Sequence, residues 1–238
     1  MSNGDSSRQP CLFTRLGVTD YPEAWKLQQS IASQRWEGLL PDTLMLLEHP
    51  HTYTLGRRGR REDVLLEEEG LGRLGVALYH VDRGGEATYH GPGQLVGYPI
   101  VDVRPLGGPV KYVRALEAVM IDVLEEFSIQ AHREDGFPGV WVGQEKIGAI
   151  GVKISRGIAT HGFALNVNPD LSYFQHIVPC GIRDMGVTSM QCLLVKPVVL
   201  EEVALRVVYY FGRRFGRDMV EMELGGLPAS EVGEQIRL

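Results

Sequence analysis

The chain has 238 residues, of which 44% are hydrophobic and 23% are charged, and its formal net charge is −6. This composition suits a globular protein with a substantial core, and the acidic balance argues against nucleic acid as the main partner. No apolar run approaches the ~18 residues of a membrane span, and the polar start MSNGDSSRQP lacks the apolar region of a secretory signal. We therefore expect a soluble cytoplasmic protein without membrane attachment, whose three cysteines are reduced.

The first half of the chain predicts a tail, a helix and several short strands. Residues 1–10 are polar and predict a flexible tail. A helix is predicted from Asp20, because Asp20 and Glu23 have capping-box spacing and Pro22 lies in the first turn. Its apolar positions are Trp25, Leu27, Ile31 and Ala32. Strands are predicted over 42–50 and 51–56, which meet at Pro50, and over 76–82 and 93–103.

The second half predicts two long helices on either side of a group of strands. Residues 108–129 carry apolar side chains at helical spacing, as does the stretch from about Val198 to Phe215. The expected core positions are Val113, Leu116, Met120, Val123, Leu124 and Phe127 in the first helix and Val203, Val207 and Phe211 in the second. Strands over 139–143, 146–154 and 158–168 are joined by short turns, which indicates hairpins or a meander. We predict one α+β domain over residues 11–238, with a mixed, mostly antiparallel sheet and packed helices.

A glycine-rich segment, RGGEATYHGPGQ at residues 83–94, comes after one of the predicted strands. Glycines let the backbone approach a ligand closely, and Arg83 adds a fixed positive charge. The segment is neither a dinucleotide fingerprint, because a strand-like run succeeds it, nor a P-loop, because no Gly-Lys-Ser/Thr ends it. Composition alone leaves a ligand-binding loop and a plain turn equally open.

A second glycine-containing segment, GRRGRR at residues 56–61, holds four arginines. Acidic residues come soon after it, so each arginine by itself is best explained as part of a solvated, locally paired surface. As a cluster the arginines predict a patch that attracts an acidic or phosphorylated partner.

One cysteine lies in a tight turn, IVPCGIRD at residues 177–184. A catalytic thiol needs a neighbouring base or cation, and the candidates are His90, His161, His176, Lys146 and Lys153. Metal binding by His176 and Cys180 lacks a second pair of ligands. Lys146 begins KIGAIGVKI, whose glycines and aliphatic residues are expected to dehydrate its amine partly and make it usable as a base. From the residues alone, a structural thiol is the favoured interpretation of Cys180.

Four motifs together change that interpretation. RGGEATYHGPGQ, KIGAIGVKI, THGFALNV and PCGIRDMGVTS occur in the order and spacing of the octanoyltransferases of lipoate biosynthesis, which the chain resembles from about Leu44 to Ser189. The upstream segment EHPHTYTLGRRG is also similar to that family. The resemblance implies a catalytic domain of the biotin and lipoate ligase type, related to class II synthetases, with a motif-bearing core of about residues 42–220.

The resemblance also implies roles for individual residues. Cys180 matches the family's acyl-thioester nucleophile, and Lys146 matches the lysine that tunes this thiol and acts as acid and base. The matching substrate-binding residues are Arg83, Gly84, Gly85, Glu86, Ala87, Thr88, Tyr89 and His90, then Ala149, Ile150 and Gly151, then Gly162, Phe163 and Ala164.

The implied reaction transfers an octanoyl or lipoyl group from acyl carrier protein to a lysine of lipoyl domains, in 2-oxoacid dehydrogenases and in the glycine cleavage H protein. The resemblance implies no ATP, metal or other cofactor, and we expect a monomer. Three alternatives remain open: an ATP-dependent lipoate or biotin ligase, which would not need Cys180, a catalytically idle binder of lipoyl domains, and an amidotransferase that moves lipoyl groups between proteins. Cys11 and Cys192 are expected to be structural.

Overall fold

The computed structural model describes residues 8–178 and 186–222. Within these residues nine strands form a mixed sheet, in the order β12-β1-β2-β6-β10-β9-β8-β7 with β11 paired to β9, and three strands form a small sheet, β4-β3-β5. The large sheet contains β1 (Gln9–Val18), β2 (Asp42–Glu48), β6 (Gln94–Ile100), β7 (His132–Glu134), β8 (Phe137–Val142), β9 (Glu145–Ser155), β10 (Ile158–Asn166), β11 (Gly186–Val187) and β12 (Arg217–Glu221). The small sheet contains β3 (Thr52–Leu55), β4 (Ala77–His80) and β5 (Ala87–His90).

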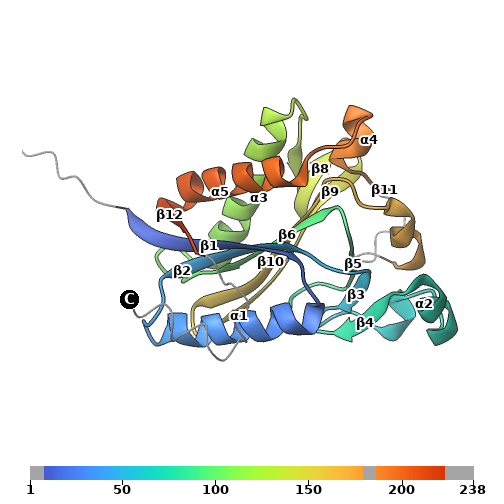
Figure 1. The fold of residues 1–238 in the computed structure, drawn as a ribbon, viewed down its shortest axis with the longest axis horizontal. Helices are drawn as coiled ribbons and strands as arrows, with labels where there is room; N and C mark the ends of the chain where they lie inside the picture. The colour runs from blue at the N-terminus through green and yellow to red at the C-terminus, as the bar shows by residue number, and fades with distance from the viewer. Residues whose placement is uncertain (1–7, 179–185, 223–238) are drawn as a thin grey trace, which may run out of the picture.

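Helices cover both faces of the large sheet (Figure 1). The α-helices are α1 (Tyr21–Trp36), α2 (Glu68–Leu74), α3 (Pro109–Glu126), α4 (Met190–Leu194) and α5 (Leu200–Phe215), and the 3-10 helices are η1 (Arg61–Asp63) and η2 (Leu171–His176). α3 and α5 pack on one face around Leu116, Met120 and Phe211, whereas α1 packs on the other face through Ala24 and Ile31. The prediction of an α+β domain with a mixed, mostly antiparallel sheet is confirmed.

The predicted central strands are confirmed in type and in order. β8, β9 and β10 form an antiparallel meander, and β10 continues onto β6. At Pro50 the chain leaves β2 of the large sheet and enters β3 of the small sheet, since proline cannot continue the ladder. The two sheets meet where the Gly84 amide donates to the Val152 carbonyl of β9 at 2.9 Å. This junction positions the cavity described below.

Some predictions at element boundaries are wrong. Gln9 and Pro10 are not tail but the first residues of β1, which is held between β2 and β12 by parallel pairing. The Asp20 side chain makes no capping hydrogen bond, so the predicted capping box is wrong. The predicted start of the helix is confirmed, with Pro22 in the first turn and the Ala24 amide donating to the Asp20 carbonyl at 3.0 Å. Gln28 of α1 is fully buried, whereas the predicted core position Trp25 is only half-buried.

Several elements had no prediction, and three of them bear on the site and the sheet. β5 lies inside the glycine-rich segment, α2 lies in the charged segment after the arginines, and β12 comes after α5. β12 exists because it pairs in parallel with β1, from the opposite end of the chain. Among the described helices, none is long and apolar enough to cross a membrane.

Candidate active site

A cavity of about 360 Å³ lies at the junction of the two sheets, bordered by the loop before β5 and by β9, β10 and α3. Residues from three motifs that are far apart in the sequence line it together. The predicted site residues that line the cavity are Arg83, Gly84, Gly85, Ala87, Thr88, His90, Lys146, Ala149, Ile150, Gly151, Gly162, Phe163 and Ala164.

Arg83 organises the glycine-rich loop from within. Its side chain is buried, and its guanidinium donates to the carbonyls of Thr54 at 2.8 Å, Gly84 at 2.9 Å and Glu86 at 2.8 Å. These carbonyls belong to β3 and to the loop itself, so the arginine ties the loop to the small sheet. The predicted fixed charge is therefore also a structural brace, because an unmet buried carbonyl costs free energy.

Glycines let the loop lie directly on the sheet. Gly151 of β9 faces Gly162 of β10, and a Cβ built on Gly151 would lie 2.9 Å from Cδ of Arg83. A Cβ on Gly162 would lie 2.2 Å from the Gly97 carbonyl oxygen. Larger residues at either position would push apart the walls of the cavity, so the glycines of the second and third motifs are required by close packing.

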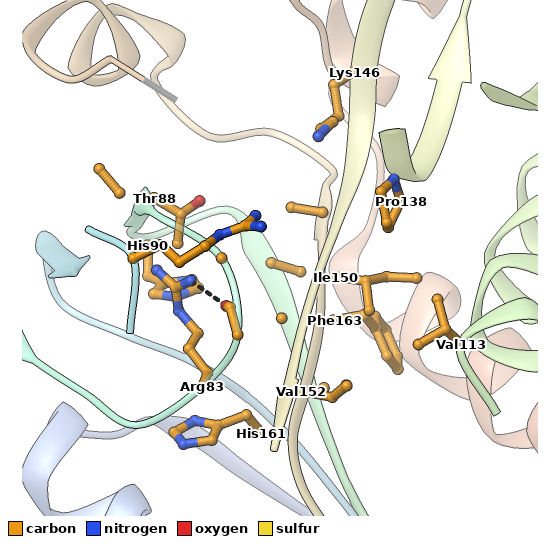
Figure 2. A pocket seen from close by; sticks show the side chains of 18 of the residues that line it. Arg83, Thr88, His90, Val113, Pro138, Lys146, Ile150, Val152, His161 and Phe163 are labelled. Carbon is orange, nitrogen blue, oxygen red and sulfur yellow. Dashed lines mark hydrogen bonds between the residues drawn. The ribbon is translucent and has the colours of Figure 1, made fainter. Parts of the chain in front are cut away.

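One wall of the cavity is apolar. Figure 2 shows Val113 of α3, Ile150 of β9 and Phe163 of β10 gathered on one side, with Pro138 close to them. The ring of Phe163 lies against Gly97, where an added Cβ would come within 2.2 Å of the ring. This wall can accept a hydrocarbon chain without burying polar groups.

Figure 2 shows His90 and His161 on the opposite side of the cavity. Tyr21 and Tyr98 also line the cavity. Nε2 of His161 lies 2.8 Å from Oδ1 of Asp82, whose Oδ2 accepts a 2.6 Å hydrogen bond from Lys153. Nδ1 of His161 lies 3.4 Å from the Tyr21 hydroxyl. Burial lowers the pKa of His161 despite the attraction of Asp82. The neutral ring therefore donates from Nε2 to Asp82 and accepts from Tyr21.

Two further histidines, His90 in this wall and His49 behind it, are held neutral. Burial lowers the pKa of His49 to about 4, and burial together with the nearby His49 holds the pKa of His90 well below its usual range. Nδ1 of His49 donates to the Thr19 carbonyl at 2.6 Å, which leaves Nε2 to accept from the Tyr98 hydroxyl at 2.7 Å. Tyr98 also lines the cavity. These two rings therefore add polar groups to this side of the cavity without adding charge.

Lys146 lies where β9 begins, and its side chain borders the cavity (Figure 2). Its Nζ lies 4.6 Å from the centre of the buried Trp141 ring, a distance at which the amine and the ring attract each other. Val187 of β11 pairs with Lys146, and the Thr188 amide donates to the Lys146 carbonyl at 3.0 Å. The last described residues of the cysteine motif therefore run beside this lysine, while Cys180 itself is outside the described residues.

Two predicted residues do not line the cavity. Tyr89 is fully buried in the core of the small sheet, where its hydroxyl lies 2.9 Å from Nδ1 of His51. Glu86 precedes β5 and is not among the residues that line the cavity, and its Oε1 lies 3.8 Å from Nε of Arg58. His176, considered as a partner for the thiol, lies in η2 and is not among the residues that line the cavity.

Sequence reasoning missed several lining residues, among them Tyr21, Tyr98, Val152 and Arg58 as a cavity residue. Tyr21 lies within the predicted start of a helix, and Tyr98 looks like one of several strand residues. Only a shared position in the tertiary structure links them to the motifs. Among the described residues, no group of three or more potential metal ligands comes together.

The chain is similar to known proteins over most of its length. The family model for the lipoyl protein ligase A/B catalytic domain matches residues 20–212. A protein from Solibacter usitatus named octanoyltransferase is 50% identical, covering 88% of this chain and 95% of that protein. Another octanoyltransferase, from Chloroflexus aggregans, is 51% identical over 81% of this chain and 89% of that protein.

Solved structures place the fold among ligases. Lipoate-protein ligase A bound with ATP aligns with a TM-score of 0.71 at 15% identity, covering 96% of this chain and 94% of that one. Biotin protein ligase from Aquifex aeolicus, in complex with biotin and ATP, aligns with a TM-score of 0.52 at 15% identity, covering 86% and 70%. These likenesses show the fold alone. The resemblance to octanoyltransferases is confirmed by the sequence relatives, and the chain belongs to the family of the lipoyl protein ligase A/B catalytic domain.

Proposed function

We propose that the protein is an octanoyltransferase of protein lipoylation, which moves an octanoyl group from acyl carrier protein to the acceptor lysine of a lipoyl domain. The names of its relatives support octanoyl transfer. The observation that carries the proposal is that Lys146 borders the same cavity as the glycine-rich loop and the two glycine-containing strand motifs. The proposed acceptors are lipoyl domains of 2-oxoacid dehydrogenases and the glycine cleavage H protein, and the proposed enzyme acts as a monomer without ATP or metal.

The proposed chemistry uses Cys180 and Lys146 as a pair. Lys146 takes the thiol proton, and the Cys180 thiolate attacks the carbonyl carbon of the donor thioester. The bond from carbonyl carbon to donor sulfur breaks, and the Lys146 ammonium protonates the departing thiolate, which leaves as a thiol. The neutral amine of the acceptor lysine then attacks the acyl-enzyme, Lys146 takes the proton that this nitrogen loses, and the Cys180 sulfur leaves. An amide replaces a thioester, which makes the cycle favourable without a nucleotide.

The geometry of the described residues supports these proposed roles of Cys180 and Lys146. The pairing of Val187 with Lys146 brings the end of the cysteine motif to the rim of the cavity. The apolar wall of Val113, Ile150 and Phe163 suits a hydrocarbon chain, since each buried methylene contributes about 0.8 kcal/mol. The Gly84 amide is already donating to Val152, so any backbone donor for the developing oxyanion would come from other amides of the loop or of β9.

Intact-mass measurement after mixing with octanoyl–acyl carrier protein, without ATP, tests the proposal. We expect one octanoyl adduct, located on Cys180 by peptide mapping. The adduct should be absent in Cys180→Ala and retained in Cys192→Ala, a matched control because Cys192 is an exposed free thiol. Lys146→Gln should slow adduct formation by about 100-fold or more, whereas Lys26→Gln, on the exposed side of α1, should not.

Several results would contradict the proposal. An adduct on Cys192, or none at all, would remove the proposed nucleophile. A requirement for ATP with release of pyrophosphate would indicate a ligase instead. Acylation that proceeds at the same rate in Lys146→Gln would remove the proposed acid and base.

A further inference from the structure

The four arginines of residues 56–61 form a turn, here called the arginine turn, that is fastened to the glycine-rich loop. The amide of Gly56 donates to the Glu86 carbonyl at 3.0 Å, that of Arg57 to the Arg83 carbonyl at 3.0 Å, and that of Arg58 to the Gly85 carbonyl at 3.1 Å. Three consecutive residues of the turn are thus bonded to the loop that borders the cavity. The position of the turn relative to the cavity is therefore fixed.

Two glycines make this contact possible. A Cβ on Gly56 would lie 2.5 Å from the Gly85 carbonyl oxygen, and a Cβ on Gly59 would lie 3.2 Å from the carbonyl carbon of Glu86. The first distance is too short for any side chain. The alternation of glycine and arginine thus lets the backbone lie close to the loop while the arginine side chains extend elsewhere.

The arginines divide into an inward one and three outward ones. Arg61 donates to the carbonyls of Val64 at 3.0 Å and Leu66 at 2.6 Å, and so braces the next segment of the chain. Arg57, Arg58 and Arg60 extend outward, and Arg58 also lines the cavity, with 73% of its side chain accessible. Among the described residues, neither the Arg57 nor the Arg60 guanidinium forms an ion pair within 4.0 Å, although the backbone amide of Arg60 donates to Oδ2 of Asp63 at 2.7 Å. Three cationic groups are therefore displayed beside the opening.

We propose that the arginine turn binds the acyl donor. This donor is an acidic carrier protein whose acyl group is attached to a phosphate-bearing arm. The inference rests on the proposed octanoyl transfer. The chain as a whole carries a net charge of −6, so its overall charge repels an acidic protein, and the attraction has to be supplied locally. Arg58 at the cavity, together with Arg57 and Arg60, supplies this attraction where the arm must enter.

The charge of the turn favours the donor over the acceptor. The acceptor presents a lysine, which approaches in water as an ammonium ion and is repelled by the guanidinium of Arg58. A phosphate-bearing arm is attracted by the same group, since guanidinium and phosphate form paired hydrogen bonds. The turn therefore distinguishes the two substrates by the sign of the charge that each brings to the opening.

The test uses Arg57→Glu combined with Arg60→Glu, which spares the cavity-lining Arg58. Lys26→Glu combined with Lys111→Glu is the matched control: both lysines lie on other elements, and the change in net charge is identical. We expect the arginine variant to raise KM for the octanoyl carrier protein about 10-fold or more at low ionic strength, and the difference to shrink in ~0.5 M salt. KM for octanoyl-pantetheine, which lacks both protein and phosphate, and KM for the acceptor domain should stay unchanged.

The outcomes separate this inference from the proposed function. If the wild-type protein is not acylated even by octanoyl-pantetheine, the proposed function fails. If it is acylated, an unchanged KM for the carrier protein in the arginine variant overturns the docking role alone. A raised KM for the acceptor domain with an unchanged KM for the carrier would also overturn it, because the turn would then serve the other substrate. Equal denaturation midpoints for all variants show that folding is not the cause.

Discussion

Arg83 of the glycine-rich loop and Arg58 of the arginine turn border the same cavity, yet their side chains end in opposite surroundings. The Arg83 side chain is buried and donates to carbonyls of β3 and of its own loop. The Arg58 side chain is 73% exposed, with Glu86 at the outer limit of an ion pair. Both segments are short, combine glycine with arginine, and are joined by backbone hydrogen bonds. An arginine beside glycines can therefore hold a loop together through buried hydrogen bonds in one segment and present an exposed positive charge in another.

The largest effect should come from separating the two segments. In Gly56→Ala the new methyl group would lie 2.5 Å from the Gly85 carbonyl oxygen and 2.8 Å from Arg83 Nη1, so the turn or the loop has to move. We expect the rate of octanoyl transfer to fall about 100-fold, since small displacements of a binding loop have effects of this size. Gly72→Ala on α2 is the control, because a Cβ there meets nothing within 4 Å. Equal activity of the two variants would show that the contact does not matter.

The same substitution at the two arginines tests the comparison directly. Arg83→Lys loses hydrogen bonds to buried carbonyls that a single ammonium group cannot all replace, and should lower the free energy of unfolding by about 2 kcal/mol. Arg58→Lys should change it by less than about 0.5 kcal/mol, as expected for an exposed side chain. Urea denaturation measures both. Similar losses of unfolding free energy in the two variants would contradict the view that Arg83 stabilises the fold and Arg58 does not.

The smallest effect concerns pH. The pKa of His49 is about 4 in the folded chain, against an ordinary value of 6.5, and that of His90 in the glycine-rich loop is also lowered by burial. The unfolded chain therefore binds more protons below pH 6.5, and stability falls as the pH falls. Between pH 7 and pH 5 we expect a loss of about 1–2 kcal/mol from His49 alone.

Denaturation curves at several pH values above the range of the carboxylates measure this loss. His49→Gln should flatten the dependence, whereas His80→Gln should not, because His80 is exposed on β4. Stability that is constant, or that rises toward pH 5, would contradict the assignment of neutral buried histidines. The arginine turn should respond to salt but not to pH in this range, which completes the contrast between the two segments.

Local pattern was enough to predict most elements of the fold. The apolar spacing of α3 and α5 and the short strand-like runs between turns in β8, β9 and β10 depend on neighbours within the same segment, and these predictions are confirmed. Pattern was insufficient for β12, a five-residue strand whose partner β1 lies at the other end of the chain. It was also insufficient for β5, because the glycines around it resemble a turn.

The amino-acid sequence by itself determined the order of the motifs, the family, and the residue types available for chemistry, because these depend only on the succession of residues along the chain. Only the tertiary structure decided that Arg83 points inward and Arg58 outward, that Tyr89 packs in a core, and that Tyr21 and Tyr98 border the cavity. The physical reason is that burial and hydrogen-bond partners come from segments distant in the sequence. These partners determine whether a charged side chain stabilises the fold or is available to bind a substrate.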